Sequence, residues 1–133
     1  MTHPILALQA TLVAALRADT ELAALAPVFD APPKGSMPPY VTIARHDVLA
    51  NDGDTTPGYE HRVILHAWAA DASRKAAVAM AERIMMMATS ATLGSDTLTV
   101  TLARHNRTDT IIDQATGRAR AAVALTFYSE PSA

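Results

Sequence analysis

The side chains best suited to chemistry in this sequence are its five histidines. His61 and His66 are an odd number of residues apart in one predicted strand, so they point to opposite faces of a sheet and cannot share an ion locally. His46 and His105 occupy matching positions in two similar segments, which would let them approach each other across the sheet. No Asp, Glu or His spacing typical of a metal site accompanies these histidines, and the pattern favours structural or surface roles.

The acidic residues give no firmer catalytic signal. Residues 51–54 (Asn51, Asp52, Gly53 and Asp54) resemble a calcium loop, but the alternating acidic positions and the distant Glu of such a loop are missing, which indicates a turn. Asp109 and Asp113 lie in a predicted loop that gives their carboxylates no fixed separation. There is no nucleophile elbow, phosphate-binding glycine loop or zinc-protease motif. We therefore expect no catalytic residue, cofactor or metal.

Three consecutive methionines, Met85 to Met87, fall within a predicted helix. Successive helical residues diverge by about 100°, so these thioethers cannot converge on one metal ion. Core packing accounts for Met87, whereas Met86 lies on the polar side of the helix with Lys75 and Glu82. An unbranched apolar side chain there suits an adaptable protein contact, and a lone exposed methionine is an equally good interpretation.

The chain has 133 residues, no cysteine and a formal net charge of -2, which is typical of one folded domain, residues 1–133. The missing cysteine excludes disulfides, thiol catalysis and thiolate metal sites. The charge gives no overall basic field for DNA or anionic membranes. The first residues lack the basic start of a signal peptide, and the uncharged run from Ile5 ends at Arg17, too short to span a membrane. We expect a protein made in the cytoplasm.

The elements alternate between helical and strand patterns. Apolar residues at helical spacing predict a first helix, with Thr2 as its N-cap, and a short second turn capped by Asp19. The prolines between Pro27 and Pro39 predict a loop. Strands are predicted at 40–44, 60–68, 98–102 and 118–128, with a long amphipathic helix between the second and third. Helix, two strands, helix, two strands gives an α+β fold with two antiparallel hairpins flanking the long helix, which packs on the sheet.

Side-chain patterns add three expectations about this sheet. The second strand carries apolar residues on both faces, so we expect both faces to be covered. Leu98, Val100 and Leu102 should all point inward. The connections at 48–59 and 107–117 exceed the length that a hairpin needs, which indicates mobile tips or contact arms.

Charged residues of both signs gather near these connections. Six arginines (Arg45, Arg62, Arg104, Arg107, Arg118 and Arg120) are accompanied by Asp47, Asp109 and Asp113. Mixed signs suit pairing between subunits better than capture of phosphate, and a plain solvated surface is the alternative. The candidate interface residues are Asp47, Asn51, Asp52, Asp54, Tyr59, Met86, Arg107, Asp109, Asp113, Arg118 and Arg120.

An ordered set of segments resembles the small tail-completion proteins of phages and gene transfer agents, which include tail terminators. The set runs from the helix at 8–19 through 22–25, the proline-rich approach to the first strand at 37–43 and the second strand at 60–68, to residues 118–121. The resemblance implies a hexameric ring that caps the tail tube, stops its growth and joins it to a neck or stopper protein, with DNA passing through without specific binding. It implies a place in the tail or neck of a phage-like particle assembled in the bacterial cytoplasm, and no catalytic residues.

A second hypothesis stays open at this point. A small α+β enzyme or ligand-binding dimer, with a pocket between sheet and helix and His46 or His66 as a base, fits the same elements. A dimer with a deep polar pocket would favour this hypothesis, whereas a ring of about six copies would favour the tail protein.

Overall fold

The computed structural model describes residues 3–52 and 57–132. Its helices are α1 (Pro4–Ala18), α2 (Thr20–Leu25) and α3 (Arg74–Ser90). Its strands are β1 (Val28–Phe29), β2 (Tyr40–Ala50), β3 (Tyr59–Trp68), β4 (Leu98–Ile112) and β5 (Ala119–Pro131). The α+β class and the two hairpins around the long helix are confirmed.

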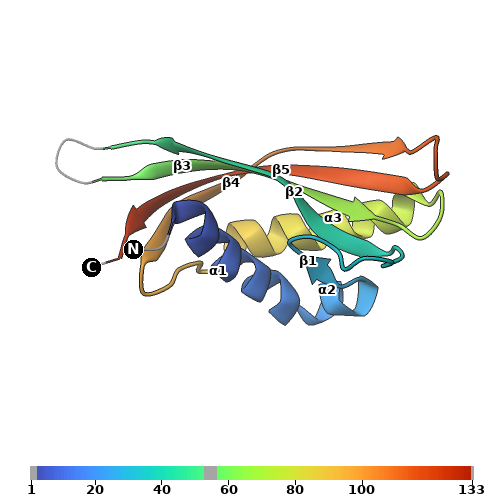
Figure 1. The fold of residues 1–133 in the computed structure, drawn as a ribbon, viewed down its shortest axis with the longest axis horizontal. Coiled ribbons are helices and arrows are strands. Elements are labelled where there is room, and N and C mark those ends of the chain that lie inside the picture. Colours follow the sequence, from blue (N-terminus) through green and yellow to red (C-terminus); the bar gives the residue numbers. More distant parts are fainter. Residues whose placement is uncertain (1–2, 53–56, 133) are drawn as a thin grey trace.

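The strands form one sheet in the order β1, β2, β3, β5, β4. Among the strands of the described residues, β1 alone runs parallel to its neighbour, and every other pair is antiparallel. Tyr59 pairs with Ser129, and Trp68 pairs with Arg120, at the two ends of β3. The β2–β3 turn and the β4–β5 turn therefore lie at opposite ends of the sheet, as Figure 1 shows.

All three helices lie on one side of the sheet (Figure 1). The α3 face toward the sheet is built largely from small residues, Ala77, Ala81 and Ala88, which let the helix approach β5 closely. The largest fully buried side chains include Phe127 and Leu12. The expectation that both faces of the sheet are covered is wrong for the single chain, because the face opposite the helices has no covering layer among the described residues.

The strands are longer than the sequence pattern predicts. β2 continues to Ala50 and β4 to Ile112, so Arg107 and Asp109 lie within a strand and the predicted arm at 107–117 shrinks to the turn after Ile112. Pairing with β5 supplies the backbone hydrogen bonds that hold the polar half of β4 extended. The predicted loop at 27–39 contains β1, which pairs with the start of β2.

Irregularities in the strands change which residues face the helices. The register shifts at Ile43/Arg45 in β2, and at Val100/Leu102 and His105/Arg107 in β4. Each extra residue reverses the inward and outward alternation beyond it. Leu102 was expected inward, but it lies opposite Tyr128 on the open face and is 49% exposed.

Candidate assembly surface

The open face of the sheet gathers most of the charged strand residues. Residues that lie directly opposite each other in neighbouring antiparallel strands point to the same face of the sheet. The register therefore shows which residues of β2, β5 and β4 share the open face with the outward side chains of β3. The face carries Tyr40, Thr42, Arg45, Asp47 and Leu49 from β2; Glu60, Arg62, Ile64, His66 and Trp68 from β3; Arg120, Ala122, Ala124, Thr126 and Tyr128 from β5; and Leu102, Arg104, Arg107, Asp109 and Ile111 from β4.

Acidic and basic side chains on this face pair along and across the strands. Asp109 Oδ2 accepts from Arg107 at 3.0 Å, and its Oδ1 accepts from Arg120 on the neighbouring strand, also at 3.0 Å. Arg45 and Asp47 pair at 3.0 Å along β2. Four of the predicted interface residues, Asp47, Arg107, Asp109 and Arg120, therefore lie on one surface, and three of them form one ion cluster.

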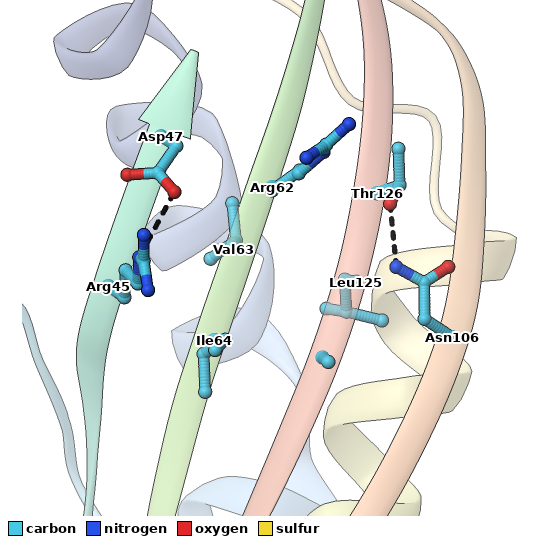
Figure 2. Close-up of a pocket in the computed structure, with 9 residues that line it drawn as sticks. Arg45, Asp47, Arg62, Val63, Ile64, Asn106, Leu125 and Thr126 are labelled. Carbon is cyan, nitrogen blue, oxygen red and sulfur yellow. Dashed lines mark hydrogen bonds and ion pairs between the residues drawn. The ribbon is translucent and has the colours of Figure 1, made fainter.

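A shallow hollow of about 300 Å³ lies in the middle of the open face. Figure 2 shows Arg45 and Asp47 on one side of it, Arg62 extending from β3, and Asn106 donating to the Thr126 hydroxyl on the other side. The small side chain of Ala124 keeps its floor low. The sequence analysis placed Arg45, Arg62 and Arg104 near the hairpins but left them out of the candidate interface, because only the register of the bulged strands aligns them with this hollow.

The other predicted interface residues lie at the ends of the sheet. Asn51 and Asp52 follow β2, and Asp52 accepts from the backbone of Gly58 at 3.2 Å. At the opposite end of the sheet, the Asp113 carboxylate accepts a hydrogen bond from Thr116 N–H, and Asp113 N–H donates to the Arg118 carbonyl oxygen. Asp113 and Arg118 therefore close the turn between β4 and β5. Asp54 lies outside the described residues.

An apolar hollow of about 240 Å³ lies at the end of the sheet where Asn51 and Asp52 are found. Tyr59 lines it together with Pro4, Pro57 and Pro131. Tyr59 is therefore half-buried at the base of the first hairpin rather than part of a free tip.

Met86 lies on the outer side of α3 and is 44% exposed. The neighbouring Arg83 reaches α2, where its Nη2 donates to Asp19 at 2.8 Å and its Nη1 pairs with Glu21 at 3.0 Å. Hydrogen bonding from Arg83 lowers the pKa of Asp19 below its ordinary value. Asp19 also accepts from Leu22 N–H, which confirms its predicted role as a helix cap.

A chain of hydrogen bonds crosses the helix side of the sheet. Gln9 Nε2 lies 3.3 Å from His46 Nδ1, His46 Nε2 lies 2.9 Å from His61 Nδ1, and His61 Nε2 lies 2.9 Å from Ser129 Oγ. An amide nitrogen only donates, so His46 accepts from Gln9 and donates to His61, and His61 donates to Ser129. The expected approach of His46 to His105 is wrong, because β3 and β5 separate their strands.

Burial lowers the pKa of His46 and of His61 to about 4. Asp47 opposes this shift at His46, and the mutual repulsion of the two histidines adds to it at His61. Both rings are therefore neutral at pH 7, as the directed chain of single donors requires. His66, on the open face, also has a lowered pKa through burial and the nearby Arg120.

Other candidate chemistry is limited in the described ranges. No group of three or more His, Asp or Glu residues there could hold a metal ion. No helix there is long and apolar enough to cross a membrane. His46 is held within the hydrogen-bonded chain, and His66 lies on the open face rather than between sheet and helix.

Comparison with known proteins decides the family. Residues 10–130 match the family model of tail completion protein gp17. The chain belongs to this family. The resemblance to tail-completion proteins is confirmed, and the chain is a structural protein of phage-type tails.

The fold of this tail completion protein has a solved counterpart. A chain in the virion of a native gene transfer agent particle has the same fold, with a TM-score of 0.83 and 23% sequence identity; the match covers 98% of this chain and 99% of that chain. None of the curated proteins matches the sequence.

Proposed function

We propose that this tail completion protein acts as one domain, residues 1–133, and assembles into a hexameric ring that caps the tail tube. The ring stops polymerisation of the tube and connects it to a neck or stopper protein, while DNA passes through its centre. The ring acts through its shape. One side makes the contact that tube rings make with each other, and the other side does not bind a further tube ring. Membership of the family is the observation that carries this proposal.

The open edges of the sheet support a ring. A closed ring uses two unlike patches on each subunit, so that one patch meets a different patch on the next copy. β4 has a strand neighbour on one side only, and β2 beyond Thr42 has none on its β1 side within the described residues. β2 and β4 run in opposite directions, because three antiparallel pairings separate them. Pairing β4 of one copy with β2 of the next would extend the sheet in antiparallel fashion.

The ends of the sheet support a subunit with two different sides. One end carries both chain ends, the first hairpin and the apolar hollow, and the other carries the tight turn closed by Asp113. A ring built from such subunits presents different chemistry above and below. We propose the first hairpin, with Asn51, Asp52, Asp54 and Tyr59, and the second, with Arg118, as contacts to the tube or the neck, and Met86 as a contact on the helix side.

The proposal is tested by mixing the purified protein with tail tubes and measuring how many copies bind at each tube end. Six 14.1 kDa subunits per tube end are expected from mass photometry or electron microscopy. Binding of the chain along the whole tube would contradict the proposal, and so would a dimer that does not bind tube ends.

A further inference from the structure

Positive charge is concentrated on the open face of the sheet. The face carries five arginines and three acidic residues, a net charge of +2, whereas the whole chain has a net charge of -2. The rest of the chain therefore has a net charge of -4, and this face differs from it in sign. The side chains of Arg45, Arg62 and Arg107 are 68%, 60% and 71% exposed.

The arginines are clustered within the face. One row across the four strands consists of Asp47, Arg62, Thr126 and Arg104. The adjacent row consists of Arg45, Ile64, Ala124 and Arg107. These eight positions hold four arginines and a single acid. Neighbouring strands are about 4.8 Å apart, so the cluster spans about 14 Å across the sheet. A DNA duplex presents one charge per about 1.7 Å of its axis, so several phosphates fit within that span.

The surroundings leave these guanidinium groups available. Arg45 pairs with Asp47, Arg62 with Glu60 and Arg107 with Asp109, and each of the three guanidinium groups is largely exposed, so these pairs contribute little and can exchange for a phosphate. Arg104 is exposed and makes no ion pair with any described residue. The low floor at Ala124, with the Asn106 amide and the Thr126 hydroxyl beside it, lets a phosphate backbone approach and offers further polar contacts.

We propose that this cluster, Arg45, Arg62, Arg104 and Arg107, contacts the phosphate backbone of duplex DNA. The inference rests on the proposed ring, in which one surface of each subunit must face the DNA. The contact is independent of sequence, because guanidinium groups on a flat sheet reach phosphates and not base edges. It is weak for each copy and is multiplied by the number of copies around the ring.

The test is binding of a short labelled duplex of random sequence, followed by fluorescence anisotropy at low and at physiological salt. The double variant Arg62→Gln/Arg104→Gln is expected to bind about tenfold more weakly at low salt and to show a shallower dependence on salt. Lys34→Gln/Lys75→Gln removes the same charge from exposed positions off this face and serves as the matched control, which should bind as the parent does. Arg104→Gln alone, which breaks no ion pair among the described residues, should show a smaller loss.

Several results would overturn this inference. They are absent duplex binding, equal losses in the face variant and the lysine control, or displacement of the duplex by poly-glutamate at matched charge, which would point to an acidic protein partner. The mass of each variant with tail tubes is measured in parallel. Normal rings that do not bind DNA would contradict only the DNA contact. A parent protein that forms no rings would contradict the proposed function.

Discussion

His46 Nε2 lies 2.9 Å from His61 Nδ1, and this contact joins strands β2 and β3 on the side of the sheet that faces α1. Both ring nitrogens of each histidine are engaged, from Gln9 on the helix to Ser129 on β5. Two protonated rings would place one N–H against another at this contact. Protonation of both rings would therefore break this chain of hydrogen bonds.

Stability should fall in acid through these two histidines. Their pKa in the folded chain is about 4, below the ordinary value of 6.5, so the unfolded chain binds more protons between these values. The contribution is complete above pH 6.5 and is lost as the pH falls toward 4. Between pH 7 and pH 4.5, the free energy of unfolding measured in urea should fall less in the double variant His46→Gln/His61→Gln than in the parent. His105→Gln, which changes an exposed histidine, should behave as the parent; identical pH profiles for all three would refute this prediction.

Removing His61 alone should destabilise the fold at pH 7. Its side chain is fully buried, and replacing it with Phe leaves the Ser129 hydroxyl and His46 Nε2 without their partners. Each unpaired buried group costs about 1–3 kcal/mol. Denaturant unfolding measures the loss, and a His61→Phe protein as stable as the parent would show that the chain of hydrogen bonds contributes nothing.

The contact between α2 and α3 should depend on Asp19. Asp19→Asn keeps an oxygen that can cap α2 but removes the charge that pairs with Arg83 and with the N-terminus of the helix, so the melting temperature should fall. Because Arg83 lowers the pKa of Asp19, this contribution is present above pH 3.8 and is lost below it. Asp30→Asn, at an exposed position, is the control. Equal melting temperatures of the two variants at pH 7 would contradict the assignment.

The small residues on the inner side of α3 should resist enlargement. Ala81 is 2% exposed against the sheet, and Ala81→Leu forces the helix away from β5 at a cost of about 1–3 kcal/mol. Val78→Leu, which enlarges an exposed position on the same helix, should cost far less. The unfolding free energies of the two variants check this, and equal values would mean that α3 does not pack closely.

The proposed contact between sheet edges can be tested by cross-linking, since the chain has no cysteine. Asn106→Cys in β4 and Val48→Cys in β2 mark the two edges. A short bis-maleimide should link the doubly substituted protein into a ladder of up to six copies on a denaturing gel. Asn106→Cys with Lys75→Cys on α3 should not form the ladder; a ladder of equal yield there would remove the edge contact.

The first hairpin, a predicted contact arm, gives a separate prediction. Deleting residues 51–56 should weaken ring formation or tail capping and leave the circular dichroism spectrum unchanged, since the core residues of the hairpin lie in β2 and β3. Normal rings and normal tails from the deletion variant would remove this arm from the account.

The sequence predicted the elements better than their ends and faces. The inward stripe of α3, including Ala77 and Ile84, follows from helical periodicity and is confirmed. The polar half of β4 resembles a loop by composition, and only its pairing with β5 holds it extended.

The bulges of β2 and β4 set the positions of Leu102 and of the arginine cluster, and no pattern in the sequence marks an extra residue in a strand. The contact of His46 with His61 similarly depends on the register of two strands. Sequence periodicity assigns faces within one uninterrupted strand, and it loses them at the first irregularity.

The most direct measurement is the length of tails assembled with and without this protein, taken from electron micrographs. The account predicts tails of uniform length that join heads when the protein is present, and overlong tails without heads when it is missing. Tails of normal length that join heads in its absence would contradict the account.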